Sequence, residues 1–410
     1  MPVEITFIRH GQTDGNVAGR WQGHTNSSLT KVGRKQAKAL GARLADHHFD
    51  LVVASDLDRT VQTAAALDRE FVTDKRWREP FFGSWEDLTT AEIMNQPGDG
   101  LRSLLSGEDV ALGGGERLSE VLDRARDALD DLVSKVDGEG SVAVISHGMT
   151  LLTLVSGLLE TMRPWPLRLL GNTSTAKLVI DGPQVWMPRY NDDTHLGDAG
   201  PHQYRQEPDD TEVLLVRHGQ TTSNVEGRWQ GHQDGELNEV GRRQIALLAR
   251  RFPKVNAMYS SPLARAADTA GAIASRQRLE IGLDDRLKEI AFGAWEGLTR
   301  AEIIERFPES AEYFRGVDVA RGGTGETFAQ VRRRFGASLA EIAGRHRGER
   351  VAVVSHGGAS RAWITEVLGM PYSHRYRLGI LGNTGYARVA FSRSGPSIVS
   401  WNLTPHLEPV

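Results

Sequence analysis

An internal repeat restricts the folds that this chain can adopt more than any other sequence feature. Residues 8–13, Ile-Arg-His-Gly-Gln-Thr, return 208 positions later as residues 216–221, Val-Arg-His-Gly-Gln-Thr. Further matches follow in the same order at nearly the same offset: 19–24 with 227–232, 55–59 with 261–265, 83–86 with 293–296, 146–148 with 355–357 and 171–173 with 382–384. A period of this length is too long for a solenoid and indicates a tandem duplication of a whole domain.

Two domains also agree with the length of the chain, since 410 residues exceed the usual size of one domain. We predict a first domain over residues 1–190, a linker over 191–210 and a second domain over 211–405. The linker is rich in Asp, Gly, Pro and His and lacks periodicity, which is typical of a connecting segment. Its two histidines, His195 and His202, are expected to be solvated rather than to bind a metal.

Composition excludes several classes of function. The absence of cysteine excludes disulfides, thiolate nucleophiles and cysteine-ligated zinc, and agrees with a reducing compartment. No apolar run is long enough to span a membrane, and no basic-plus-apolar leader opens the sequence, so a cytoplasmic protein is predicted. Residues 1–205 hold 22 Lys and Arg against 29 Asp and Glu, and residues 206–410 hold 27 against 24. A uniformly basic nucleic-acid-binding protein is therefore not indicated.

Hydrophobic patterning within each repeat alternates between strand and helix. Short apolar runs at 3–8, 51–54 and 142–145 predict buried strands, whereas Ser119 to Val136 carries apolar residues at helical spacing. Thr30 is a plausible N-cap for a helix between the first two strands. This order predicts an α/β fold in which each domain has a mainly parallel sheet with helices on both faces.

Each repeat places two histidines and two arginines where predicted strands end. His10 and His147 each follow a predicted strand, Arg9 precedes the first histidine, and Arg59 lies at a strand-to-helix turn. Adjacent parallel strands would bring these groups to one edge of the sheet, where ligands bind in such folds. The guanidinium group suits phosphate because it donates two parallel hydrogen bonds. The second repeat has the same four groups in Arg217, His218, Arg265 and His356.

The ordered motif set resembles the histidine phosphatase superfamily, with the phosphoglycerate-mutase-like fold. It consists of Arg9-His10-Gly11-Gln12-Thr13 with Asn16, Ser55-x-Leu57-x-Arg59, Glu79 ahead of Gly83-x-Trp85-Glu86, and Ser146-His147-Gly148. The second repeat contains every one of these, including Glu289 ahead of Gly293-x-Trp295-Glu296. Any one motif is weak, but the ordered set, present twice, is specific.

The resemblance implies a role for each motif residue and implies that no metal or other cofactor is needed. His10 and His218 would be the nucleophiles that form phosphohistidine, and Glu79 and Glu289 would be general acids. The phosphate would be held by the other matched residues: Arg9, Asn16, Arg59 and His147, then Arg217, Asn224, Arg265 and His356. Gln22 and Gln230 are possible pocket residues.

The same resemblance favours a phosphatase over a phosphoglycerate mutase, because mutases carry a longer insertion between the acid and the second histidine. The expected substrate is a small phosphomonoester. A mutase reaction remains the alternative, as does one active domain beside a regulatory domain that binds a phosphorylated ligand. Specificity is expected to come from the segments 81–116 and 291–326, which differ between the repeats. The sequence does not set an oligomeric state.

Overall fold

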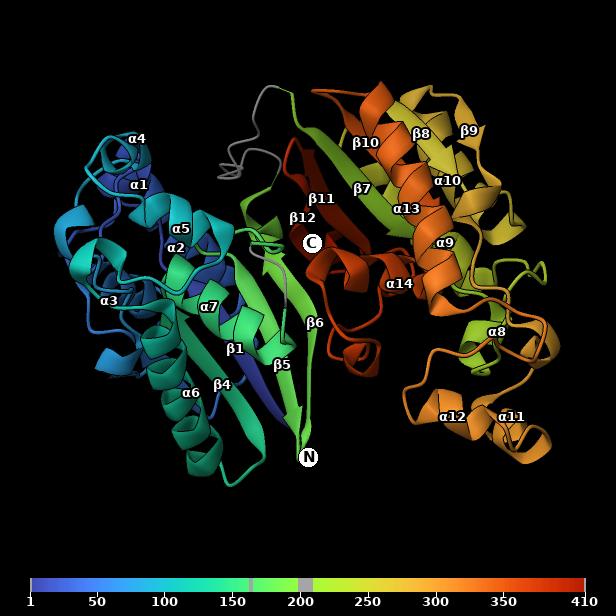
Figure 1. Ribbon diagram of the computed structural model, residues 1–410, viewed down its shortest axis with the longest axis horizontal. Helices are drawn as coiled ribbons and strands as arrows, with labels where there is room; N and C mark the ends of the chain where they lie inside the picture. The colour runs from blue at the N-terminus through green and yellow to red at the C-terminus, as the bar shows by residue number, and fades with distance from the viewer. Residues whose placement is uncertain (1, 162–164, 198–208, 409–410) are drawn as a thin grey trace. The chain divides into compact units, whose positions relative to one another are not determined.

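The computed structural model describes residues 2–161, 165–197 and 209–408. The chain forms two compact units, Met1–Arg205 and Gln206–Val410, and Figure 1 shows a sheet flanked by helices in each. No helix among these residues combines the length and the apolar character that crossing a bilayer requires.

The first unit is built on a six-stranded mixed sheet in the order β3-β2-β4-β1-β5-β6. Its strands are β1 (Val3–Arg9), β2 (Leu51–Ala54), β3 (Val72–Thr73), β4 (Gly140–Ser146), β5 (Thr175–Asp181) and β6 (Gln184–Asp192). The pairs β1–β4, β4–β2 and β2–β3 are parallel, whereas β1–β5 and β5–β6 are antiparallel. The predicted α/β class with a mostly parallel sheet is confirmed.

Helices cover both faces of this sheet. They are α1 (Asp14–Ala18), α2 (Lys31–Arg43), α3 (Asp58–Ala65), α4 (Thr90–Met94), α5 (Gly100–Ser106), α6 (Leu118–Lys135) and α7 (Gly148–Leu159). On one face Leu40 of α2 and Ala64 of α3 pack on Ile8 and Ile145. On the other, α6 packs against α7, as Figure 1 shows. Thr30 caps α2 by accepting a hydrogen bond from the Gly33 N–H, as predicted.

The second unit repeats this arrangement in the order β9-β8-β10-β7-β11-β12. Its strands are β7 (Thr211–Arg217), β8 (Ala257–Ser260), β9 (Ile281–Leu283), β10 (Arg350–Ser355), β11 (Tyr386–Ser392) and β12 (Gly395–Leu403). Its helices are α8 (Thr222–Val225), α9 (Glu239–Arg251), α10 (Ala264–Gln277), α11 (Arg300–Arg306), α12 (Ser310–Phe314), α13 (Phe328–Arg345) and α14 (Gly357–Leu368).

The register of the central strands brings the two histidines of each unit together. Arg9 pairs with Ser146 in the parallel β1–β4 ladder, so His10 and His147 both follow the carboxyl ends of neighbouring strands. The second unit has the same register, with Arg217 opposite Ser355. The sequence-based expectation that adjacent strands place both histidines at one sheet edge is confirmed.

Ordered structure continues into the range predicted as linker. β6 runs to Asp192, whose buried carboxylate accepts hydrogen bonds from the Arg43 guanidinium at 3.0 and 2.8 Å. His195 is half-buried, and its Nε2 lies 3.0 Å from the Thr173 hydroxyl. Burial, together with the charge of Arg43, lowers the pKa of His195 to about 4. The expectation of a solvated histidine is therefore wrong for His195, and His202 lies outside the described residues.

Candidate active site

The first histidine of each domain is held with one ring nitrogen free. The Nδ1 of His10 lies 2.7 Å from the Gly11 carbonyl oxygen, and the Nδ1 of His218 lies 2.7 Å from that of Gly219. A carbonyl oxygen only accepts, so Nδ1 carries the proton and Nε2 keeps its lone pair. Burial, then the charges of Arg59 and Arg9, lower the pKa of His10 well below its usual value. Each imidazole is thus neutral in the free protein, with a lone pair on Nε2.

The second histidine lies beside the first, beneath the floor of the pocket. The ring centroids of His10 and His147 are 5.2 Å apart, and His147 is the N-cap residue of α7. Its Nε2 lies 2.9 Å from the Ser55 hydroxyl, and the Arg59 Nε donates to its Nδ1 at 3.2 Å. In the second domain the ring centroids of His218 and His356 are also 5.2 Å apart. Each second histidine is fully buried and oriented by a serine from the neighbouring strand end.

The site arginines are fixed by main-chain carbonyl groups, and Arg59 and Arg265 are fully buried. Arg59 donates to the carbonyl oxygens of Gly23 and Thr25 at 2.7 and 2.9 Å, and Arg9 donates to Leu170 at 2.5 Å. In the second domain the equivalent bonds are Arg265 to Gly231 at 2.8 Å and to Gln233 at 2.9 Å, and Arg217 to Leu381 at 2.7 Å.

These bonds leave several buried guanidinium N–H groups without a hydrogen-bond partner, namely the Nε of Arg9, Arg217 and Arg265. Burial is the largest influence on the pKa of Arg217, which falls to about 10. Buried donors without partners are costly. An anion that entered the pocket would supply the missing acceptors.

The N-terminal turn of a helix holds the carboxyl group of each predicted acid. Glu79 accepts hydrogen bonds from the Met149 N–H at 3.1 Å and from the Thr150 N–H at 3.1 Å, at the start of α7. Glu289 accepts from the N–H groups of Gly358 and Ala359 at 3.0 and 2.7 Å, at the start of α14. The two carboxyl groups therefore occupy equivalent places.

The two acids differ in one donor. Ile290 donates its N–H to Glu289 at 2.9 Å, whereas Pro80, which follows Glu79, has no N–H to donate. In the first domain the Thr150 hydroxyl lies 3.3 Å from Glu79 and 2.7 Å from the Arg78 carbonyl oxygen, to which it donates. The Trp77-Arg78-Glu79-Pro80 sequence therefore leaves its acid in an equivalent position.

Glu86 and Glu296 lie close to Glu79 and Glu289 in sequence, but they accept hydrogen bonds from a loop that follows the first histidine. Glu86 accepts from the His24 N–H at 2.6 Å and from the Thr25 hydroxyl at 2.9 Å, and Glu296 accepts from the His232 N–H at 2.9 Å. Neither residue lines the pockets.

The asparagine predicted for the pocket lies on α1, and the glutamine lies on the loop that follows this helix. The Asn16 Oδ1 accepts from the Thr13 N–H at 3.1 Å and from the Asn172 amide at 3.2 Å, which turns the Asn16 amide nitrogen away from these partners. Gln22 is buried and bonds to the Thr13 hydroxyl at 2.7 Å. In the second domain Asn224 has the same two partners in Thr221 and Asn383, and the Gln230 carbonyl oxygen accepts from the Thr221 hydroxyl.

Most of the predicted groups in each domain line one cavity. The first cavity has a volume of about 450 Å³ and is lined by Arg9, His10, Asn16, Gln22, Arg59 and Glu79 among others. The second has about 270 Å³ and is lined by Arg217, His218, Asn224, Gln230, Arg265 and Glu289 among others. Across residues 2–161, 165–197 and 209–408, no group of three or more His, Cys, Asp or Glu side chains could hold a metal ion.

Several residues that support the site have no predicted role in the sequence motifs. Ser55 and Ser261 orient the second histidines, and Asn172 and Asn383 donate to the carbonyl oxygens of His10 and His218. Their signal was available, because all four are identical between the repeats. Arg361 and Arg375, which line only the second cavity, gave no such signal.

Comparison with known proteins agrees with this geometry. The sequence model of the histidine phosphatase superfamily (branch 1) matches residues 5–193 and 213–404. The chain belongs to the histidine phosphatase superfamily. Phosphoserine phosphatase 1 of Hydrogenobacter thermophilus is 35% identical over 201 residues, 48% of this chain and 93% of that protein.

Two further relatives have names that state an activity. A metal-independent phosphoserine phosphatase of Arabidopsis thaliana is 44% identical over 161 residues, 37% of this chain and 66% of that protein. A glucosyl-3-phosphoglycerate phosphatase of Mycolicibacterium vanbaalenii is 33% identical over 191 residues, 43% of this chain and 83% of that protein. The protein is a phosphatase of the histidine phosphatase superfamily with two such domains.

Proposed function

We propose that each domain hydrolyses small phosphomonoesters through a phosphohistidine intermediate, with no metal ion. The observation that carries the proposal is the hydrogen bond from Nδ1 of His10 to the Gly11 carbonyl oxygen at 2.7 Å, repeated at His218. It leaves a neutral Nε2 with a free lone pair beside buried arginines, and that is the group needed to attack a phosphorus atom.

The first half of the reaction transfers the phosphoryl group to the histidine. Arg9 and Arg59 bind the phosphate dianion and stabilise the charge on its equatorial oxygens. The Nε2 of His10 attacks phosphorus, and the bond to the ester oxygen breaks. Glu79, as the carboxylic acid, gives its proton to the departing oxygen, so that the product leaves as an alcohol.

The second half returns the site to its starting state. Glu79 is now a carboxylate and takes a proton from a water molecule, whose oxygen attacks phosphorus. The N–P bond breaks, inorganic phosphate leaves, and His10 is again a neutral imidazole. The residues His218, Arg217, Arg265 and Glu289 perform the same steps in the second domain.

The test uses the full chain with His10→Ala, His218→Ala and both replacements together. Each single variant should lose the phosphohistidine peptide of one domain, trapped by alkaline quench and identified by mass spectrometry, and should keep phosphate release at the other. His48→Ala, at an exposed histidine paired with Asp50, is the matched control. Unchanged turnover in one single variant, with complete loss in the other, would instead indicate one active and one regulatory domain. Phosphate exchange between two phosphoglycerates with little release to water would indicate a mutase.

A further inference from the structure

The second cavity contains a half-buried arginine that has no hydrogen-bond partner among the described residues. Arg361 lies on α14 and lines the cavity with His218 and Arg217. Among the described residues no hydrogen bond or ion pair engages its guanidinium, and its Nε is buried without a partner. The Tyr376 ring lies 5.2 Å from the guanidinium carbon, and the charges of Arg375 and Glu289 also act on this side chain. Burial lowers its pKa. A partly buried charge without a direct ion pair is costly, so the position of Arg361 points to an anionic ligand.

A second arginine in the same cavity also lacks an acidic partner. Arg375 is 2% exposed and donates to the carbonyl oxygens of Tyr372 and Tyr313 at 2.9 and 3.1 Å. Its guanidinium carbon lies 3.9 Å from the Tyr372 ring centroid, and its Nε has no hydrogen bond. The main-chain bonds and the ring fix the side chain, but they do not neutralise its charge.

The charge lining this cavity exceeds what one phosphate requires. Five arginines line it, and Glu289 is the single carboxylate among the described lining residues. Arg217 and Arg265 belong to the phosphate site, and Arg228 is paired with Glu226 and Glu302. Arg361 and Arg375 are neither assigned to the phosphate site nor paired with a carboxylate among the described residues. The charge of Arg361 is among the causes that lower the pKa of Arg217, so it acts within the range of the phosphate site.

We propose that Arg361 and Arg375 form a subsite for a second anionic group, so that the second domain prefers small phosphomonoesters carrying an additional carboxylate or phosphate. This inference rests on the proposed function and deepens it for one domain. The guanidinium groups would donate charge-assisted hydrogen bonds to that anion, which would be desolvated in a narrow cavity where such bonds are strong.

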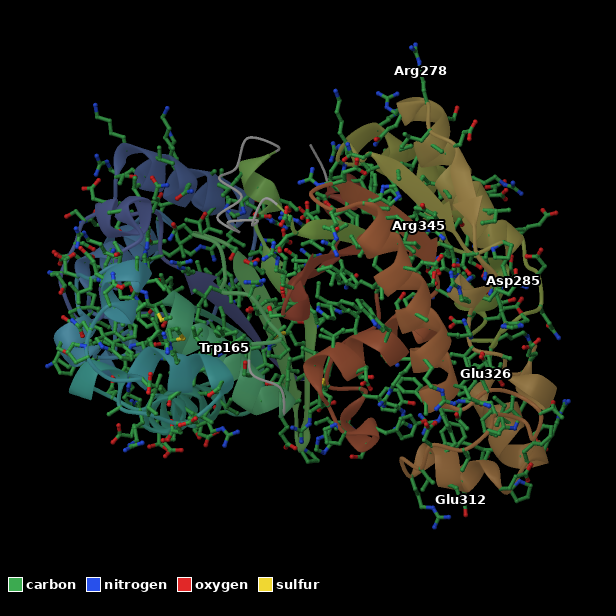
Figure 2. The ribbon with its side chains drawn as sticks, turned by 45° about the horizontal axis from the view of Figure 1, so that its top comes forward. Trp165, Arg278, Asp285, Glu312, Glu326 and Arg345 are labelled. Carbon is green, nitrogen blue, oxygen red and sulfur yellow. The ribbon has the colours of Figure 1, made fainter. Side chains whose placement is uncertain are left out.

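At the position of Arg361 the first domain has an apolar residue. Leu152 occupies the position of Arg361 in the matching helix and is 3% exposed. Trp165, labelled in Figure 2, stands where the second domain has Tyr376, and its indole N–H donates to the Leu104 carbonyl oxygen at 3.1 Å. Met149 and Leu169 line the first cavity. The two domains would therefore divide substrates by charge.

The experiment measures kcat/KM for matched substrate pairs in the full chain carrying His10→Ala, so that only the second site is active. O-phosphoserine and O-phosphoethanolamine differ by one carboxylate, and fructose 1,6-bisphosphate and fructose 6-phosphate differ by one phosphate. We expect the more anionic member of at least one pair to be preferred, and the pair that responds identifies the anion. Arg361→Leu should lower that preference by about 10- to 100-fold, the usual range for losing a hydrogen bond to a charged group.

Leucine at this position is compatible with the fold, because the first domain has Leu152 there. Arg361→Lys should keep part of the preference, since it keeps the charge but loses the planar fork. The matched control is Arg333→Leu, which removes an exposed charge of α13 outside the cavity and should leave the ratio unchanged. The same pairs tested in a His218→Ala chain report on the first domain, where no preference is expected.

p-Nitrophenyl phosphate separates failure of the inference from failure of the proposed function. If the His10→Ala chain hydrolyses it but shows no preference in either pair, the subsite is absent while the phosphatase stands. A preference that persists undiminished in Arg361→Leu overturns the assignment to Arg361. If the His10→Ala chain hydrolyses no phosphomonoester, the proposed function of this domain fails, and the inference fails with it.

Discussion

Replacing Glu79 with glutamine, in a chain whose second site is silenced by His218→Ala, separates the two steps proposed for that carboxyl group. Glutamine keeps the size of the side chain but cannot give or take the proton. Its amide oxygen can still accept from one of the two N–H groups of Met149 and Thr150, and its NH₂ group would face the other. The lost bond costs about 1 kcal/mol, which is small against a usual domain stability of about 5–15 kcal/mol. The effect should therefore be kinetic.

A positioned general acid or base usually contributes about 10²–10⁴-fold to the rate. We expect hydrolysis of alkyl phosphates in Glu79→Gln to fall by that factor, because an alkoxide is a poor leaving group without a proton. p-Nitrophenolate leaves without one, so p-nitrophenyl phosphate should still phosphorylate His10. Water activation would remain slow. Stopped-flow absorbance should then show a burst of about one p-nitrophenolate per active site, while phosphohistidine accumulates.

The matched control is Glu86→Gln in the same background. Glu86 bonds to the backbone of His24 and the hydroxyl of Thr25 and does not line the cavity, so both esters should be affected only slightly and no burst should appear. If Glu79→Gln slowed both esters equally without a burst, or if Glu86→Gln reproduced the burst, the acid would have been assigned to the wrong residue.

Three further outcomes follow from the same geometry. Because the pKa of His10 is lowered, its imidazole should become protonated only well below the usual histidine pKa of about 6.5. In a His218→Ala chain, kcat/KM corrected for substrate ionisation should therefore stay flat through a pH of about 6.5. A fall in kcat/KM near that pH would contradict the neutral imidazole. Prolonged EDTA treatment should leave turnover unchanged, because arginines supply the positive charge; loss of activity that a divalent cation restores would indicate a metal-dependent reaction. Ser55→Ala removes the 2.9 Å contact that orients His147 and should lower kcat/KM about tenfold, whereas Ser28→Ala, at a loop serine bonded to Gln62, should not.

Much of the fold was predictable because strand periodicity and loop motifs are local. The apolar runs at 3–8 and 142–145 became β1 and β4, and their parallel direction agrees with strand–helix alternation. Their direct pairing does not follow from chain order, because β1 lies beside β4 and not beside β2, the next strand along the chain. The linker boundary was less predictable. In sequence Asp192 resembles a polar linker residue. In the structure it forms an ion pair with Arg43, which is far away in the chain, and this contact joins it to the first domain.

The cavity lining was predictable only where the two repeats agree. Motif residues such as Arg59 and Glu79 can be recognised because the same residue type recurs at the corresponding position of the second repeat. Arg361 recurs nowhere, and the aromatic residues that act on it, Tyr313 and Tyr376, lie on separate segments that only tertiary packing brings together. A charged residue within a largely apolar helix is ordinarily assigned to the surface in sequence, so the place of Arg361 in the same cavity as His218 was not foreseeable.

The duplication shows which parts of the site tolerate change. The hydrogen bond from Nδ1 of the first histidine to the next carbonyl oxygen has the same length in both domains, 2.7 Å for His10 and for His218. The second histidines lie 2.9 and 2.8 Å from their serines. By contrast, α7 and α14 carry Leu152 and Arg361 at the same helical position. The proposed phosphate site lies at the ends of β1 and β4, or of β7 and β10, whose relative position is fixed by the ladder register, together with Arg59 of α3 or Arg265 of α10. The remainder of a substrate meets the helix and cap residues, which the register does not constrain. A common chemistry and separate specificities can therefore coexist on one chain, because they depend on different parts of the fold.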